Sequence, residues 1–178
     1  MATSTALVTV EEFRKLKDPP GVRLELHNGE VVEVTCPKHK HFKIQKRLMK
    51  IFEDVLGALG DASYEFAFRP RSEHEFRVAD VAWVSADRYE GIDDEDNLRG
   101  APDIVVEVLS PSNTASEMVE KRDLCFSAGC REFWIVDSKK RFIEITPVDG
   151  VPHVYRGSDP VRIGDRTFPV DEILGTVR

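Results

Sequence analysis

The stretch PDIVVEVLSPSNTASEMVEKRDLCFSAGCREFWIVD, residues 102–137, constrains the fold more than any other part of the sequence. It begins with a nearly continuous β-branched and apolar run at 104–109, which is typical of a strand buried on both faces. Turn and cap residues then lead into a predicted helix that ends near Ala128. Residues 132–136 predict a second strand, so the stretch predicts a strand–helix–strand crossover between parallel strands.

Two charged residues interrupt the apolar pattern of this unit. Glu107 stands inside the first strand, where an ionised carboxylate costs free energy unless it is paired or bound to a metal. Lys121 lies on the apolar stripe of the helix, three residues after Met118 and four before Cys125. Two interpretations stay open. Lys121 extends past the edge of the core into solvent, or the helix packs on the sheet and directs the ammonium group at Glu107.

A second acid occupies another apolar strand. In the predicted strand at 76–85, every residue from Val78 to Val84 is apolar except Asp80. Because side chains alternate along a strand, we expect Asp80 to share a face with Val78, Ala82 and Val84.

The rest of the chain adds further elements around this unit. Thr9 and Glu12 have the spacing of a capping box, and Asn28-Gly29 between two apolar runs predicts a hairpin. Besides the elements already described, we expect helices at 10–16, 39–59 and 170–174. We expect strands at 22–26, 31–35, 62–68, 141–145, 153–156, 161–163 and 167–169. The last three of these strands are expected to extend the sheet at one edge.

Length and composition favour one α/β domain spanning 1–178, with a core at about 22–146 and an edge extension at 147–178. No apolar run is long enough to cross a membrane, and the N-terminal residues lack the pattern of a secretory signal. The three cysteines have no metal-finger spacing, so we expect a reducing cytoplasm. The net charge of −7 argues against a constitutive basic nucleic-acid binder, but it does not exclude a nuclease whose acids hold metal.

The acids and the lysine suit one chemistry in particular. Two neighbouring carboxylates raise each other's pKa unless a cation lies between them, and Mg²⁺ (or Mn²⁺) supplies that charge. A lysine nearby can orient water or neutralise charge on a phosphate, so Asp80, Glu107 and Lys121 together fit metal-dependent phosphodiester hydrolysis. Asp103 is a weaker accessory candidate. The alternative is that Glu107 and Lys121 form a buried salt bridge without catalytic purpose, with Asp80 bonded to backbone amides.

The motifs PDIVVEVLSPSN and EKRDLCFSAGCREFWIVD, together with LELHNGEVVEV and VADVAWV, closely resemble the signature of the Uma-two family. This resemblance implies the restriction-endonuclease-like PD-(D/E)XK fold, a mixed central sheet flanked by helices, here with N-terminal and C-terminal β-hairpins. It implies that Asp80 is the first metal-binding acid and Glu107 the acid of the E-x-K element. The sequence departs from the common pattern at Leu109, where the lysine of that element would stand, and Lys121 fits the displaced role.

The same resemblance matches His41 to a histidine that opens the long helix, and Glu25 to an acid in the first hairpin; both are accessory candidates. We therefore expect a Mg²⁺-dependent endonuclease acting on DNA, in which the carbonyl of Val108 joins Asp80 and Glu107 as a metal ligand. A homodimer is expected, since cutting both strands of a duplex favours two copies of the site. The alternative is a non-catalytic binding or assembly protein that keeps the nuclease fold with a buried acid–lysine pair.

Overall fold

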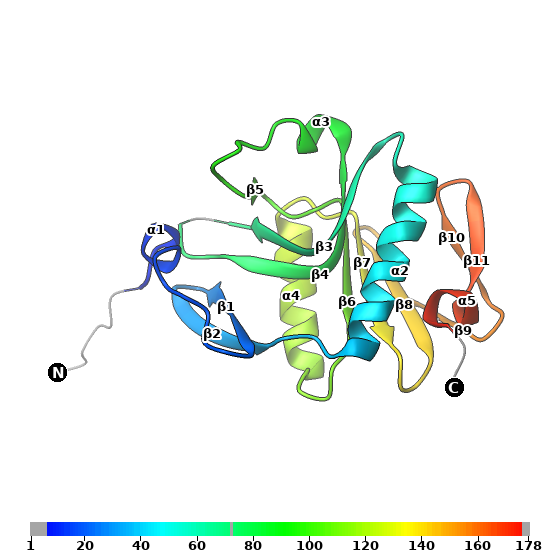
Figure 1. The fold of residues 1–178 in the computed structure, drawn as a ribbon. Coiled ribbons are helices and arrows are strands. Elements are labelled where there is room, and N and C mark those ends of the chain that lie inside the picture. The colour runs from blue at the N-terminus through cyan, green and yellow to red at the C-terminus, as the bar shows by residue number, and fades with distance from the viewer. Residues whose placement is uncertain (1–6, 72, 176–178) are drawn as a thin grey trace.

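A computed structural model describes residues 7–71 and 73–175 of the chain. Its central feature is a seven-stranded sheet with the strand order β5-β3-β4-β6-β7-β8-β9 (Figure 1). The strands of this sheet are β3 (Gly60–Arg69), β4 (Arg77–Ser85), β5 (Leu98–Arg99), β6 (Ile104–Val108), β7 (Glu132–Asp137), β8 (Phe142–Pro147) and β9 (His153–Arg156). The sheet is mixed, because β6 pairs with β7 and β3 with β5 in parallel, whereas the other neighbours are antiparallel.

The predicted crossover is confirmed: helix α4 (Ala115–Ser127) connects the parallel strands β6 and β7. A capping box at Thr114 starts this helix, where the threonine hydroxyl accepts from the amide of Glu117 and the Glu117 carboxylate accepts from the amide of Thr114. The helix ends at Gly129, whose φ of 100° lies in the left-handed region.

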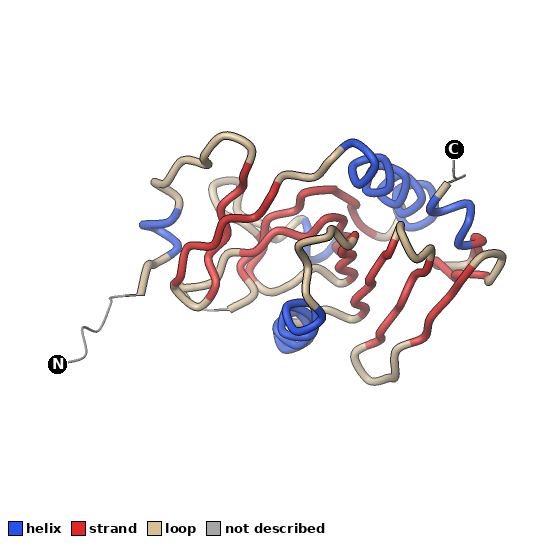
Figure 2. The backbone as a smooth tube through the Cα atoms, turned by 90° about the horizontal axis from the view of Figure 1, so that it is seen from below, coloured by secondary structure: helices blue, strands red, loops and turns tan. Residues whose placement is uncertain are grey.

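Two helices cover opposite faces of the sheet (Figure 2). On one face, α2 (His39–Leu56) packs Leu48 and Phe52 against Trp134, and the rings of Phe52 and Trp134 meet edge to face at 5.6 Å. On the other face, α4 contributes Cys125 to a second cluster of buried apolar residues. The sheet is therefore buried on both sides at its centre, as the apolar run in β6 predicts.

The N-terminal hairpin is also confirmed, formed by β1 (Val22–His27) and β2 (Glu30–Thr35). Asn28 and Gly29 have φ values of 49° and 82°, as a two-residue type I′ turn requires. The hairpin docks on the sheet through a bridge between Leu26 and Phe76, beside the short helix α1 (Val10–Phe13), which ends earlier than predicted.

The C-terminal segment differs in part from the prediction. Strand β9 extends the sheet edge, but β10 (Pro160–Ile163) and β11 (Arg166–Pro169) form a separate two-stranded sheet. Together with α5 (Val170–Leu174), this hairpin packs against α2 and buries apolar side chains in the main core. The segment between β4 and β6 contains one further short helix, α3 (Ala86–Tyr89).

No helix in the described part of the chain is long and apolar enough to cross a membrane. Residues 1–6, which belong to the segment examined for a secretory signal, lie outside the described residues.

Candidate active site

The candidate site forms where the ladders between β3, β4 and β6 are interrupted. Regular pairing of β4 with β6 stops at Val81 and Val106, and beyond it the carboxylate of Asp80 accepts the amide hydrogen of Val108 at 2.7 Å. On the other side of β4, pairing with β3 skips the position between Asp80 and Glu65, and Glu65 has a φ of 52°. A non-glycine residue in this region marks a locally strained backbone, and such positions concentrate at functional sites.

This interruption overturns the predicted orientation of Asp80. Ala82 and Val84 pack in the cluster on the α4 side of the sheet, where the alternating pattern also placed Asp80. Instead, Asp80 contacts His41 and Gln45 of α2, on the opposite face. Simple alternation fails here because it describes an unbroken strand, and β4 is irregular at this residue.

Side chains from α2 hold the Asp80 carboxylate in place. His41 Nε2 lies 3.0 Å from Oδ2, and Gln45 donates from Nε2 to Oδ1 at 3.0 Å. The same amide group of Gln45 also donates to Glu65, whose carboxylate is paired with Arg23. Asp80 is thus fixed from three directions, by the β6 backbone and by two residues of α2.

Glu107 and Lys121 meet as the second interpretation of the lysine predicts. Lys121 Nζ lies 2.8 Å from Glu107 Oε1 and donates to the carbonyl of Val78 at 2.8 Å. Both side chains are buried, and Lys121 lies among Leu124 and other apolar residues of the inward face of α4. The lysine therefore does not extend into solvent.

The pKa values of this pair are shifted by burial and by the surrounding carboxylates. Burial raises the pKa of Glu107 to about 7, an effect that Lys121 offsets in part and that the charge of Asp80 reinforces. Burial alone would lower the pKa of Lys121, but the carboxylates of Glu107, Glu25 and Asp80 outweigh it and raise that pKa. Lys121 consequently keeps its charge. Because several carboxylates share this one lysine, Glu107, whose pKa is raised, is the group that takes up a proton.

Glu25 of β1 also belongs to the polar cluster that contains Asp80, Glu107 and Lys121. Its carboxylate lies 3.1 Å from both Arg23 and His27 and is buried. Burial opposes ionisation of Glu25, but the charge of Lys121, followed by His27 and Arg23, lowers its pKa to about 2. The accessory residues Glu25 and His41 are thus brought to the site, from the hairpin and from α2 respectively.

Asp103 is not brought to the site. Its carboxylate accepts from the backbone amide of Ser85 at 2.9 Å and lies 3.0 Å from Arg88 and 3.1 Å from Arg131. Asp103 precedes β6, and the three residues between it and Glu107 place the two Cα atoms about 13 Å apart. The contacts of Asp103 are therefore with Ser85, Arg88 and Arg131 and not with the residues of the candidate site.

Three polar residues of the cluster were not predicted from the sequence: Arg23, Gln45 and Glu65. Gln45 carries a usable signal, because it is an amide on the buried face of α2, beside Ile44 and Leu48. Glu65 carries none, because only its left-handed backbone conformation directs it toward Gln45. Arg23 looks like an ordinary surface residue of the hairpin until Glu65 and Glu25 are known to lie beside it.

Two carboxylates and one backbone carbonyl are the candidate ligands for a divalent ion at this site. Within the described residues no three His, Cys, Asp or Glu side chains are grouped as a ready metal site. Asp80 and Glu107 nevertheless supply two carboxylates, and buried Oε1 of Glu107 receives no hydrogen bond of normal geometry. The amide of Leu109 bonds toward β7, so the neighbouring Val108 directs its amide and carbonyl toward the Asp80 side. Mg²⁺ commonly takes such a set of one or two carboxylates with water completing the shell.

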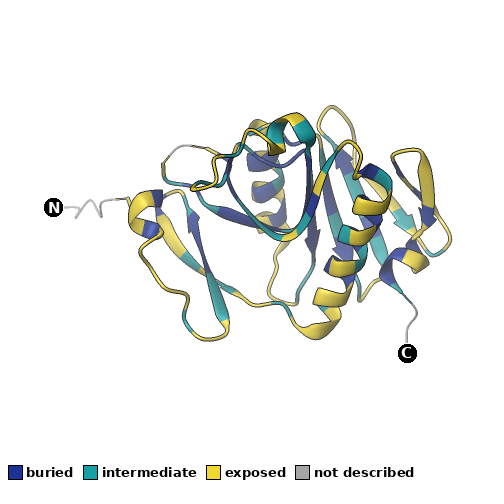
Figure 3. Ribbon diagram, turned by 45° about the horizontal axis from the view of Figure 1, so that its top comes forward, coloured by how far each residue is buried: buried dark blue, intermediate teal, exposed yellow. Residues whose placement is uncertain are grey.

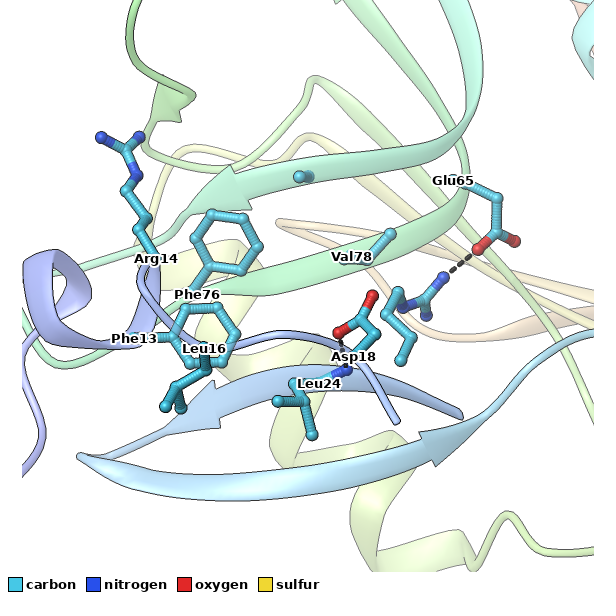
Figure 4. A pocket seen from close by; sticks show the side chains of 10 residues that line it. Phe13, Arg14, Leu16, Asp18, Leu24, Glu65, Phe76 and Val78 are labelled. Atoms are coloured by element: carbon cyan, nitrogen blue, oxygen red, sulfur yellow. Dashed lines mark hydrogen bonds and ion pairs between the residues drawn. The ribbon is translucent and has the colours of Figure 1, made fainter. Parts of the chain in front are cut away.

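A pocket of about 300 Å³ borders the cluster on the hairpin side (Figure 4). It lies between α1, the β1–β2 hairpin and strands β3 and β4. Its lining includes Arg23 and Glu65, which also contact Glu25 and Gln45 of the site. The other lining residues are Phe13, Arg14, Leu16, Asp18, Leu24, Ala67, Phe76 and Val78.

A mixed central sheet with half-buried Asp80 and buried Glu107 on adjacent strands, and with Lys121 on the crossover helix, agrees with the restriction-endonuclease-like fold that the sequence resemblance implies. The family model of Uma2, described as "Putative restriction endonuclease", matches residues 10–170. The chain therefore belongs to the Uma2 family, as the sequence resemblance implies.

The comparison with solved structures supports the same fold. A crystal structure from Anabaena variabilis ATCC 29413, described as "a putative nuclease belonging to DUF820", superposes with a TM-score of 0.79 at 18% sequence identity. The match covers 94% of this chain and 97% of that chain. A comparison with curated proteins gives no match.

Proposed function

We propose that this protein is a Mg²⁺-dependent or Mn²⁺-dependent endonuclease that hydrolyses phosphodiester bonds of DNA. The observation that carries the proposal is the buried ion pair of Lys121 with Glu107 beside Asp80, at a break in the sheet. Family membership adds nuclease chemistry of the restriction-endonuclease type as the expected class.

Each residue has a role that follows from its contacts. Asp80, Glu107 and the carbonyl of Val108 would hold the divalent ion, which when bound supplies positive charge that acidifies water and stabilises a phosphate. Lys121 keeps its charge and can donate a hydrogen bond to the attacking water or to a phosphate oxygen. His41 and Gln45 fix the orientation of the Asp80 carboxylate.

The basic residues of α2 support DNA as the substrate. Lys38, Lys43, Lys46 and Lys50 are exposed at or on α2, whose outer face is solvent-accessible (Figure 3). Lysines in such a row can neutralise backbone phosphates, even in a chain of net charge −7. Since cutting a duplex takes two cleavage events, we extend the proposal to a homodimer, which light scattering of the purified protein tests.

A second candidate is a non-catalytic nucleic-acid-binding or assembly protein with the same fold. One observation favours it: Leu109 occupies the position where the E-x-K pattern has its lysine, and Lys121 must act from a different backbone element.

Nicking of supercoiled plasmid DNA separates the two candidates. The wild-type protein with 5 to 10 mM Mg²⁺ or Mn²⁺, concentrations on the order of those that saturate weak oxygen sites, should convert the plasmid to open circles. Glu107→Gln, which keeps the shape of the side chain, should reduce the rate by about 100-fold or more. Glu53→Gln, an exposed acid of α2, is the matched control and should leave it unchanged. Equal activity of the wild type and Glu107→Gln would reject the proposed site.

A further inference from the structure

An exposed pair of aromatic rings lies beside the candidate site. Phe42 of α2 and Tyr64 of β3 are 37% and 38% exposed, and their ring centroids are 5.4 Å apart with planes at 88°. In an edge-to-face pair each ring keeps at least one face free of the other. The two rings therefore offer aromatic surface to a ligand while fixing each other's orientation.

The pair is linked to the site through the residues next to it in sequence. Phe42 follows His41, which contacts Asp80, and Tyr64 precedes Glu65, which accepts from Gln45. Tyr64 also lies opposite Val81, the residue after Asp80. Both rings are therefore carried by residues directly next to those that contact Asp80 and Gln45.

Exposed lysines flank the rings. Lys38 and Lys46 are four residues before and after Phe42, a spacing that brings residues to the same side of a helix, and Lys43 is adjacent. All three are exposed. Stacking surface beside a row of positive charge is the combination by which proteins bind single-stranded nucleic acid, with bases on the rings and phosphates on the lysines.

We propose that Phe42 and Tyr64 form a stacking platform for an unpaired base, so that the protein selects DNA with unpaired nucleotides next to the phosphate at the site. This inference rests on the proposed nuclease function, because that function identifies the phosphate at the site as the one that is cleaved. A base inside a B-form duplex already stacks on both neighbours, so its face is not available to the rings. Single strands, flaps and gaps share the required chemistry, because each presents an unstacked base.

Binding measurements test the platform separately from cleavage. Fluorescence anisotropy in EDTA, which prevents metal-dependent cutting, compares the full-length protein on a labelled single strand, a flapped duplex, a gapped duplex and an intact duplex. We expect the wild type to bind at least one of the three substrates with unpaired bases tighter than the intact duplex by about tenfold or more. Which of the three binds best identifies the natural arrangement. Equal affinity for all four overturns the inference.

The variant that removes both rings is Phe42→Leu with Tyr64→Leu, which keeps apolar volume and so limits any effect on folding. It should lose about 10- to 100-fold in affinity for unpaired DNA and change less than about twofold for the duplex. Phe42→Tyr with Tyr64→Phe should restore the preference. Tyr89→Leu removes an exposed aromatic of α3 as the matched control and should have no effect. Parallel loss on duplex and unpaired DNA, with unchanged melting temperature, overturns the platform.

Two further outcomes keep this inference distinct from the proposed function. Absence of a preference for unpaired DNA in the wild type, with plasmid nicking intact, rejects the platform alone, whereas a ring-dependent preference without any nicking supports the platform and rejects the nuclease. Light scattering tests whether a second copy of the chain, and not DNA, covers the two rings. If the Leu variant turns a dimer into a monomer, a second copy of the chain covers the rings and the platform is rejected.

Discussion

At the scale of single residues, the site depends on how one lysine is shared among several buried acids. Lys121 contacts Glu107 directly, and its charge also acts on Glu25. The net shifts of the two acids nevertheless differ: burial, which Lys121 offsets only in part, raises the pKa of Glu107 to about 7, whereas Lys121 together with His27 and Arg23 overcomes burial and lowers the pKa of Glu25 to about 2. The cation thus stabilises one carboxylate as an anion and leaves the other ready to exchange its proton for a metal ion.

The raised pKa of Glu107 predicts a pH dependence of stability. The folded state holds this proton up to about pH 7, whereas the unfolded chain releases it near 4.5, so this contribution is present below 4.5 and lost as the pH rises through 7. Urea unfolding in a chelating buffer should show wild-type stability falling over this window by on the order of 1 to 3 kcal/mol relative to Glu107→Gln. Glu25 titrates between about 2 and 4.5, outside this window. Parallel pH profiles of wild type and variant would contradict the assignment.

The ion pair predicts that the effects of replacing Glu107 and Lys121 on the free energy of unfolding are strongly non-additive. Lys121→Met alone leaves Glu107 and its neighbours without their buried cation, and we expect it to lower the free energy of unfolding by about 3 to 5 kcal/mol. Adding Glu107→Leu should recover most of that loss, because both charges are then gone. Chemical denaturation of the two single variants and the double variant measures the coupling. Additive losses would show that the pair does not act as a unit.

At the scale of elements, α4 determines where the ammonium group lies. Its first turn is fixed by the capping box of Thr114 and Glu117, and its inward face carries Lys121 among apolar residues. The central strands contribute Asp80 and Glu107, and the N-terminal hairpin and α2 contribute further polar residues around them. The hairpin, α2 and α4, which are distant in sequence, must therefore all dock on the sheet before the site is complete.

Loss of the capping box should weaken α4 without changing its contacts with the sheet. Thr114→Ala removes the hydroxyl that accepts from the amide of Glu117, and we expect a loss of about 0.5 to 2 kcal/mol in the free energy of unfolding. Thermal or urea unfolding measures it, with Val119→Ala at an exposed position of the same helix as the control. Equal effects at the two positions would show that the cap contributes nothing specific.

At the scale of the whole molecule, a bound metal ion would stabilise the fold by linkage. An ion present at 100 times its dissociation constant adds about 2.7 kcal/mol, and a domain of this size gains roughly 2 to 4 °C per kcal/mol. We expect Mg²⁺ or Mn²⁺ to raise the melting temperature at pH 8, where Glu107 is ionised. Asp80→Asn should abolish the shift, and Asp123→Asn, an exposed acid of α4, should preserve it. An unchanged shift in Asp80→Asn would remove Asp80 from the metal site.

Much of the fold follows from local patterns. The apolar run of β6, the capping box of α4 and the Asn28-Gly29 turn each specify their element through short-range sterics and hydrogen bonds. The buried position of Glu107 could also be predicted, because it interrupts an otherwise apolar strand, whereas the sequence left two interpretations of Lys121 and the structure decided between them. Strands β10 and β11 were assigned to the sheet edge incorrectly, since short strands do not show which partner they will pair with.

The sequence by itself determined the order of the elements and the presence of Glu107 in a buried strand, because periodicity is a local property of the chain. Only the tertiary structure decided that Asp80 turns toward α2, that Asp103 serves elsewhere, and that Gln45 and Glu65 join the cluster. The physical reason is that these positions depend on a broken ladder and on contacts between segments far apart in sequence, which no repeating pattern encodes.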